Sequence, residues 1–437
     1  MQYDLIVIGF GKAGKTLAGK MAQAGQKVAL IEQDPAMNGG TCINIACIPT
    51  KTLIHAVENH LSFQEAMALK DVVVQRLNQK NTVTLTDKGV DLYQAKARFI
   101  SNHQIQVTGG DQDMILEAKT ILINTGAKSR DAGIEGLTST PGVYDSTGIQ
   151  RLKDQPQSLA VIGGGNIGLE FASLYAQLGT QVTVYENSSQ VLSRYEPEVA
   201  QLAKDYLEED GVQFVLDAKV SSVQASPGGP VVVNGQDRQT YDAVLYALGR
   251  IPNTQDLGLE NTDIQLTDRG AIQVDDHLQT TVAGVYAAGD VTGGLQFTYT
   301  SLDDYRIIYG HLSGSNTYAL SDRRNVPTSL FINPPIAQVG LTEAQAKEKG
   351  LSYQAKSQAV ATMPKAHVNN QLRGLYKVIV DPETKLVLGA TLMGENSHEI
   401  INLIKMAMDN LIPYTYIANQ VFTHPTFAEN FNDVFAF

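Results

Sequence analysis

Cys42 and Cys47 are the two side chains of this sequence whose type and spacing point most directly to chemistry. They are the only cysteines among 437 residues, and they lie in the glycine-led segment GGTCINIACIPTK. A structural cross-link over so short a loop would gain only about 2 kcal/mol, and two thiols are too few ligands for a structural zinc site. The spacing therefore favours a redox-active dithiol and disulfide over two inert, buried thiols.

A glycine motif occurs twice and predicts two dinucleotide sites. Residues 4–33 and 158–187 align without a gap, and each copy indicates a strand, a G-x-G-x-x-G turn, a helix and a second strand that ends in Glu. The glycines allow a tight turn and a close approach to a pyrophosphate, which the helix N-terminus attracts, and the Glu can bind a ribose. The residues concerned are Gly9, Gly11, Gly14 and Glu32 in the first copy, and Gly163, Gly165, Gly168 and Glu186 in the second.

Glu186 also bears on which nicotinamide nucleotide binds. A carboxylate at this place favours a free 2′-hydroxyl and repels a 2′-phosphate. The residues that follow, Asn187 to Gln190, include no Arg that could hold a phosphate. We therefore expect NADH rather than NADPH.

The composition excludes several classes of function. The net charge is −12, which argues against a surface for nucleic acid or for an anionic membrane. No apolar run approaches the roughly 20 residues of a membrane helix, and the N-terminus lacks the features of a signal peptide. The histidines show no metal-ligand spacing, so no metal site is expected. We expect a cytoplasmic protein with no nucleic-acid or membrane partner.

The whole constellation resembles the class I flavoprotein disulfide reductases, which include lipoamide dehydrogenase, glutathione reductase and mercuric reductase. GGTCINIACIPTK is similar to the redox-disulfide signature of that family, and GDVTGG to its second FAD motif. VPTSLFINPPIAQVGLTE resembles the start of its dimerisation domain, and FTHPTFAE its catalytic His-Glu motif. The resemblance covers nearly the whole chain, and it implies FAD at the first repeat and NAD(P)H at the second.

The resemblance also implies roles for individual residues. Cys47 would be the charge-transfer thiol beside the flavin, and Cys42 the interchange thiol that faces the substrate. Lys51 would lie near the flavin and pair with Glu170. The FAD site would include Thr125, Gly126 and Asp290, and Thr41 and Gly249 are placed with the cofactor-binding residues.

His424 and Glu429 would form the acid/base dyad of the family. An imidazole has an unperturbed pKa of roughly 6.5, which suits proton transfer at neutral pH. A carboxylate five positions later could fix its tautomer, although a lone His before Pro is more often structural. The resemblance implies that His424 reaches the disulfide of the partner subunit, so we expect a homodimer with a shared active site.

One position departs from the pattern of the family. After the GGG of the second repeat, many members have a Tyr that covers the nicotinamide pocket, whereas this chain has Asn166. The smaller polar side chain would leave the pocket less sealed without preventing NADH from binding.

Three stretches favour one subfamily. The cysteine loop, the run QFTYTSLDDYR and the ending VFTHP resemble the bacterial reactive-chlorine resistance flavoproteins and the related hypothiocyanous acid reductases. We therefore expect NADH-dependent reduction of a small oxidant, hypothiocyanous acid, in defence against oxidative stress. A lipoamide dehydrogenase-like activity and a flavin-dependent Cu(II) reductase are the enzymatic alternatives. A redox sensor is the non-enzymatic one, but a sensor needs no NADH site.

The expected fold is α/β, with two nested Rossmann-type dinucleotide-binding domains and a C-terminal α+β dimerisation domain. An FAD-binding domain would comprise residues 1–150 and 265–325. An NAD-binding domain, 151–264, would be inserted in it, and the dimerisation domain would span 326–437. The insertion explains why Asp290 lies so far along the chain from Gly9.

Overall fold

The computed structural model describes residues 1–109, 113–315 and 317–437. The chain divides into two compact units. The first unit contains Met1–Arg130, Ser146–Lys153 and Leu248–Asp322, and the second contains Asp131–Asp145, Asp154–Ala247 and Arg323–Phe437. Within the described ranges, no helix combines the length and the apolar character that crossing a membrane requires.

The first unit is built on a mixed sheet with the strand order β3-β2-β1-β6-β5-β4, in which β17 also pairs with β6. The N-terminal part of β6 pairs antiparallel with β5, and its C-terminal part pairs parallel with β17. The strands are β1 (Gln2–Ile8), β2 (Val28–Glu32), β3 (Asp91–Gln94), β4 (Lys96–Ser101), β5 (Gln104–Thr108), β6 (Met114–Ile123) and β17 (Val285–Ala287). β1, β2 and β3 run parallel, so their carboxyl ends share one edge of the sheet.

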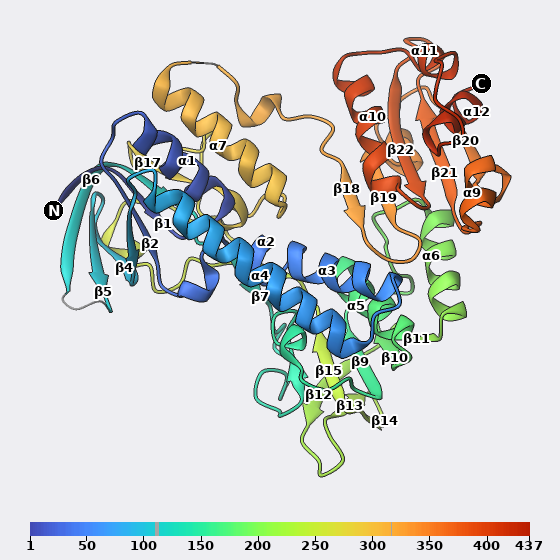
Figure 1. Cartoon of the computed structure of the whole chain (residues 1–437), viewed down its shortest axis with the longest axis horizontal. Coiled ribbons are helices and arrows are strands. Elements are labelled where there is room, and N and C mark those ends of the chain that lie inside the picture. The colour runs from blue at the N-terminus through green and yellow to red at the C-terminus, as the bar shows by residue number, and fades with distance from the viewer. Residues whose placement is uncertain (110–112, 316) are drawn as a thin grey trace. The chain divides into compact units, whose positions relative to one another are not determined.

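Both faces of β1 are buried, as its continuous apolar sequence predicts. Leu5 and Val7 pack on one face with residues of helices α1 (Lys12–Gln23) and α7 (Thr298–Ser313), which lie side by side in Figure 1. Ile6 and Ile8 belong to a separate cluster on the opposite face. This arrangement fixes the β1–α1 turn at the carboxyl edge of the sheet.

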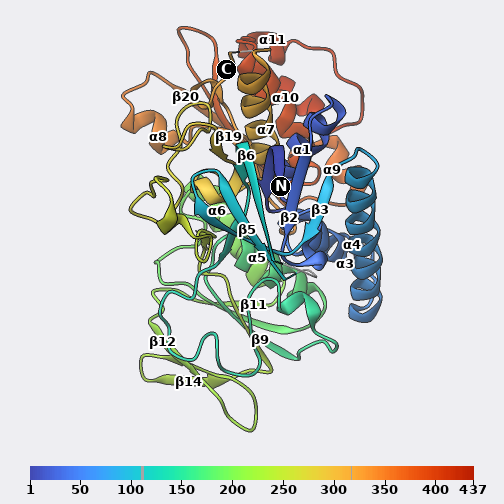
Figure 2. The ribbon, with the colours of Figure 1, turned by 90° about the vertical axis from the view of Figure 1, so that its left-hand side faces the viewer.

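The thiol segment follows β2 as three helices. These are α2 (Thr41–Asn44), α3 (Cys47–Glu58) and α4 (Phe63–Thr86), of which α3 and α4 pack against each other (Figure 2). A capping box between Ser62 and Glu65 starts α4. The unit also contains the antiparallel pair β7 (Ala127–Ser129) and β16 (Arg250–Pro252), and the 3-10 turns η1 (Pro35–Met37), η2 (Ile149–Arg151), η3 (Leu259–Asn261), η4 (Gly289–Thr292) and η5 (Leu320–Asp322).

The second unit begins with a parallel sheet in the order β11-β10-β9-β15-β8. A smaller antiparallel sheet, β12-β13-β14, is a separate element of this unit. The elements are β8 (Val143–Tyr144), β9 (Ser158–Ile162), α5 (Asn166–Gln177), β10 (Gln181–Tyr185), α6 (Pro197–Glu209), β11 (Val212–Val215), β12 (Val220–Gln224), β13 (Val231–Asn234), β14 (Asp237–Thr240) and β15 (Ala243–Tyr246).

The C-terminal sheet completes the second unit. It is antiparallel, with the order β18-β19-β22-β21-β20, and α10 packs against β19 and β22. Its elements are β18 (Thr328–Leu330), β19 (Ile336–Gly340), α8 (Glu343–Glu348), β20 (Gln354–Ala359), η6 (Val360–Thr362), α9 (Pro364–Asn369), β21 (Leu375–Val380), β22 (Val387–Met393), α10 (Ser397–Asp409), α11 (Tyr414–Ala418), η7 (Ala428–Asn430) and α12 (Phe431–Val434).

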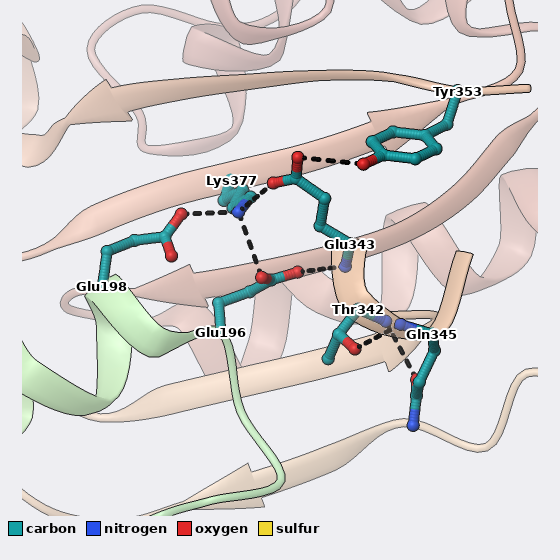
Figure 3. Close-up of polar contacts among 7 residues, drawn as sticks. All are labelled: Glu196, Glu198, Thr342, Glu343, Gln345, Tyr353 and Lys377. Atoms are coloured by element: carbon teal, nitrogen blue, oxygen red, sulfur yellow. Dashed lines mark hydrogen bonds and ion pairs between the residues drawn. The ribbon is translucent and has the colours of Figure 1, made fainter. Parts of the chain in front are cut away.

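A buried lysine joins the C-terminal sheet to the segment that starts α6 (Figure 3). Lys377 on β21 is 5% exposed. Its Nζ lies 3.0 Å from Glu196, 2.6 Å from Glu198 and 2.7 Å from Glu343. Burial alone would lower the pKa of Lys377, but hydrogen bonds to these three carboxylates raise it. The two parts of the second unit are therefore held together by a charged core contact.

The predicted α/β fold class is confirmed. Both repeats form the expected strand–turn–helix–strand unit, as β1–α1–β2 and as β9–α5–β10. The division into three domains, with its boundaries near 150, 265 and 326, stays a prediction.

Candidate active site

Cys42 and Cys47 lie close together in the first unit, as two half-buried thiols. Cys42 belongs to α2, and Cys47 is the first residue of α3. Gln150 holds the loop between them, since its Nε2 donates to the carbonyl of Ile45 at 3.0 Å. Within residues 1–109, 113–315 and 317–437, no group of three or more His, Cys, Asp or Glu side chains could hold a metal ion.

The surroundings of the two thiols shift their pKa values in opposite directions. A hydrogen bond to Cys47 raises the pKa of Cys42, and burial raises it further. The same hydrogen bond lowers the pKa of Cys47 against the effect of burial, with the help of Thr298 and of the charge of Lys51. Cys47 also begins a helix, where the partial positive charge of the N-terminus favours a thiolate. Cys47 is therefore the thiol that ionises first.

Thr298 is the residue of this centre to which the sequence assigned no role. It is the first residue of α7, and its Oγ1 lies 3.5 Å from the Sγ of Cys47. The rings of its neighbours Phe297 and Tyr299 stack with their centroids 5.0 Å apart. The signal in the sequence was the run QFTYTSLDDYR, but nothing in that run indicates that the first of its two threonines contacts a thiol.

The first glycine turn is packed too tightly for side chains. Gly9 has a φ of +97°, and a Cβ on Gly11 would collide with the side chain of Asn124. Asn124 accepts the N–H of Gly14 at 2.9 Å and donates to the carbonyl of Ala288 at 2.6 Å. This asparagine, whose role the sequence did not reveal, thus ties the start of α1 to the ends of β6 and β17.

Glu32 and Glu186 occupy equivalent places in the two repeats. Glu32 accepts the N–H of Phe10 at 3.0 Å, and Glu186 accepts the N–H of Gly164 at 2.8 Å. Each therefore closes the turn between the first strand and the helix of its repeat. Burial raises the pKa of Glu32, while three backbone N–H groups oppose this effect. Glu186 also accepts the N–H of Ser188 at 2.8 Å.

The helices after both turns begin with glycine. Gly11 is the N-cap of α1 and Gly165 is the N-cap of α5. Because glycine has no side chain, neither of these N-caps places a side chain over the start of its helix. The partial positive charge at a helix start suits the phosphates of a dinucleotide, and the glycine cradle leaves room for a close approach. The residues present therefore fit FAD and a nicotinamide nucleotide.

Five more residues predicted to bind a cofactor are all in the first unit. Thr125 donates to the carbonyl of Asn253 at 2.8 Å, and Gly126 has a φ of +72°. Burial raises the pKa of Asp290, which the charge of Arg250 opposes. Thr41 begins α2 beside Cys42, and Gly249, with a φ of +96°, accepts the N–H of Arg130 at 3.0 Å.

The second repeat is fastened to the C-terminal sheet at α5. The buried hydroxyl of Tyr195 makes hydrogen bonds to Asn166 and Thr328. Glu170 is buried, and its Oε1 accepts the N–H of Phe331 at 3.0 Å. The predicted pairing of Glu170 with Lys51 stays a prediction.

His424 and Glu429 are brought together as the sequence predicts. The Nδ1 of His424 lies 2.8 Å from Glu429 Oε2, and the other oxygen of this carboxylate accepts the N–H of Thr426 at 3.2 Å. The imidazole is 68% exposed, whereas the Glu429 side chain is 18% exposed. A half-buried carboxylate thus orients a ring whose second nitrogen can face outward.

The chain matches two family models. Residues 3–304 match the pyridine nucleotide-disulphide oxidoreductase family, and residues 326–435 match the dimerisation domain of the same family. Similar proteins include the probable pyridine nucleotide-disulfide oxidoreductase RclA of Escherichia coli, 46% identical over 100% of this chain and 99% of that protein. A mercuric reductase of Staphylococcus aureus is 34% identical, over 95% of this chain and 80% of that protein.

Solved structures give the same result. The HOCl-induced flavoprotein disulfide reductase RclA of Escherichia coli superposes with a TM-score of 0.96, with 46% identity and 99% of each chain covered. Its Cu(II) complex superposes with a TM-score of 0.97, over 100% of this chain and 99% of that chain. The similarity therefore extends over both units.

Proposed function

We propose that Cys42 and Cys47 are the redox centre of this chain, which belongs to the pyridine nucleotide-disulphide oxidoreductase family. The observation that supports this best is the unequal pair of thiols, in which a helix N-terminus, Thr298 and Lys51 all favour the thiolate of Cys47. Family membership implies FAD and a pyridine nucleotide. When bound, FAD would pass two electrons from the nicotinamide to the disulfide.

We further propose that the oxidant is small and that it is hypothiocyanous acid. Cys42, as thiolate, would attack the sulfur of HOSCN, so that an S–S bond forms as the S–O bond breaks and the oxygen leaves as water. Cys47 would then attack Cys42, re-forming the disulfide while thiocyanate leaves with the electron pair. Each turnover would convert one HOSCN and one NADH into thiocyanate, water and NAD⁺.

The second repeat would bind NADH rather than NADPH. In support, Glu186 directly follows the second strand of this repeat, where a carboxylate repels a 2′-phosphate. The residue whose backbone N–H it accepts after the strand is Ser188 rather than an arginine. The first repeat would bind FAD through its glycine turn, Glu32 and Asp290.

His424 would move the protons. It would accept the proton of the Cys42 thiol and return it to the departing oxygen, and Glu429 would hold its tautomer. The exposure of the imidazole supports a role on the active site of a second copy of the chain. The match of residues 326–435 to a dimerisation domain supports the homodimer that this role requires.

Stopped-flow turnover of the flavin-loaded protein tests the proposal. NADH and NADPH would each be tried against hypothiocyanous acid, lipoamide, oxidised glutathione and Cu(II). We expect fast turnover with NADH and hypothiocyanous acid, and none in Cys42→Ser, because the sequence has no third cysteine that could form a disulfide with Cys47. Faster turnover of lipoamide than of hypothiocyanous acid would instead establish a lipoamide dehydrogenase-like enzyme.

Cu(II) is the alternative substrate that a specific observation favours, since a structural relative is described as a Cu(II) complex. Reduction of Cu(II) would transfer one electron per ion and form no S–S bond with the substrate. Cu(II) turnover that outpaces every sulfur-containing oxidant would therefore replace the proposed substrate and would assign the thiols to metal binding rather than to sulfur exchange.

A further inference from the structure

Lys15 is a half-buried cation that the proposed chemistry does not use. It lies in the first turns of α1, one residue after the last glycine of the first G-x-G-x-x-G motif. Its Nζ donates to the carbonyl of Gly39 at 2.9 Å. Gly39 begins the short loop that leads through Gly40 to Cys42. Burial removes water that stabilises an ammonium group, and one hydrogen bond to a neutral carbonyl replaces only part of that stabilisation. We therefore expect Lys15 to have a further favourable interaction.

The thiol loop packs directly against the turn from which α1 starts. A Cβ on Gly40 would meet the Cα of Gly11 at 2.9 Å and the carbonyl oxygen of Phe10 at 3.0 Å. This close approach brings α1 beside the thiol loop, and it leaves Lys15 within electrostatic reach of Cys42. Lys15 is thus bonded to the loop that carries the Cys42 thiol.

We propose that Lys15 is a positioning residue that fixes the Gly39–Cys42 loop and stabilises the Cys42 thiolate for attack on the oxidant. This inference rests on the proposed role of Cys42 as the attacking thiol. The hydrogen bond from Lys15 to the Gly39 carbonyl would fix the loop that positions the Cys42 sulfur. The ammonium charge would offset the cost of burying the Cys42 thiolate. The hydrogen bond to Cys47 disfavours ionisation of the Cys42 thiol, and the charge of Lys15 opposes that effect.

The electrostatics around Lys15 agree with this role. Burial and the charge of Lys12 lower the pKa of Lys15 to about 8, and Cys42 acts in the opposite direction. Lys15 in turn favours the ionised form of Cys42. Lys12, a cation of the same helix, and the Cys42 thiol are thus two groups whose charges act on Lys15. A negative charge on Cys42 would strengthen this pairing.

Alkylation of the reduced, flavin-loaded protein tests the inference. Iodoacetamide reacts with a thiolate, so that an S–C bond forms as iodide leaves, and its rate against pH reports ionisation of the thiol. We would measure it in the Cys47→Ser background, where mass spectrometry follows Cys42 alone. A nearby opposite charge shifts a pKa by about one unit or more, so Lys15→Met should slow alkylation at neutral pH by about tenfold.

Two matched variants sharpen the result. Lys15→Arg keeps the charge and should restore most of the rate, whereas Lys20→Met removes an exposed cation from the last turn of the same helix and should change nothing. An unchanged pH profile in Lys15→Met would overturn the inference. Loss of flavin from that variant with an unshifted Cys42 profile would also overturn it, by assigning the charge to the cofactor.

The readout separates this inference from the proposed function. Alkylation needs neither NADH nor an oxidant, so a shifted profile supports Lys15 even if hypothiocyanous acid proves a poor substrate. Conversely, fast turnover of hypothiocyanous acid with no shift in Lys15→Met would sustain the function and reject the role of Lys15.

Discussion

At the scale of single residues, the contact between Thr298 and Cys47 makes a direct prediction. The pKa of Cys47 is depressed, so its thiolate persists below the usual range and is lost as the pH falls through that pKa. Thr298→Val removes one hydrogen bond to the thiolate and should raise the pKa by roughly half a unit to one unit. The long-wavelength thiolate-to-flavin band of the two-electron-reduced protein, titrated against pH, measures this shift.

Thr298→Ser is the matched control, since it keeps the hydroxyl and should titrate like the natural protein. A band that disappears at the same pH in all three proteins would show that Thr298 does not contribute to the ionisation of Cys47.

The two cysteines should differ in the same spectrum. Cys47→Ser should abolish the charge-transfer band, because it removes the thiolate that the environment favours. Cys42→Ser should retain the band, since it leaves that thiolate in place. Absorbance after reduction by one equivalent of NADH decides the matter, and the reverse pattern would exchange the two roles.

The sequence alone was enough to single out those candidate residues that lie close to their partners along the chain. Cys42 and Cys47, or His424 and Glu429, can be recognised because each pair acts within a few residues of the chain. Thr298 and Cys47 are 251 positions apart, so only the packing of α7 in the first unit brings them together. Lys15 was hidden for the same reason, since its contact with the thiol loop depends on how closely two glycine turns approach.

At the scale of elements, the second repeat makes a prediction about nucleotide choice. Glu186 closes the turn after β9 and would repel a 2′-phosphate. Glu186→Ala combined with Ser188→Arg should therefore narrow or invert the preference for NADH over NADPH, as kcat/KM for each nucleotide would show. Because Glu186 also accepts two backbone N–H groups, Glu186→Ala alone should raise the KM for both nucleotides.

The internal repeat explains why these elements were predictable. The turn, the helix and the acidic residue are local, and their hydrogen bonds recur in both copies at equivalent positions. No local pattern predicts the role of Asn124, which directly follows β6 and binds the first turn from more than a hundred residues away along the chain. Equal kcat/KM values for NADH and NADPH in the natural protein would contradict the reading of Glu186.

At the scale of the whole molecule, Lys377 makes a prediction about stability. Lys377→Met would leave Glu196, which is 1% exposed, as a buried carboxylate without its cation. Breaking such a pair costs about 3–5 kcal/mol. Denaturant unfolding should therefore show a lower midpoint for the second unit, while exposed Lys349→Met leaves it unchanged. Adding Glu196→Gln should recover part of the loss, and an unaltered midpoint in Lys377→Met would show that the carboxylates find other partners.

The largest-scale prediction concerns two copies of the chain. If His424 serves the cysteines of a second copy, a heterodimer of Cys42→Ser and His424→Ala chains has one site with both defects and one intact site. Such heterodimers, isolated with two affinity tags after co-expression, should show about half the activity of the natural dimer. The assay needs a substrate whose turnover His424→Ala alone lowers strongly, and an alkyl disulfide suits it, because its alkyl thiolate leaving group requires a proton from an acid. If the dyad instead serves the cysteines of its own chain, both sites of the heterodimer are defective. The heterodimer would then be no more active than the parent variants, and His424 would act on the thiols of its own copy.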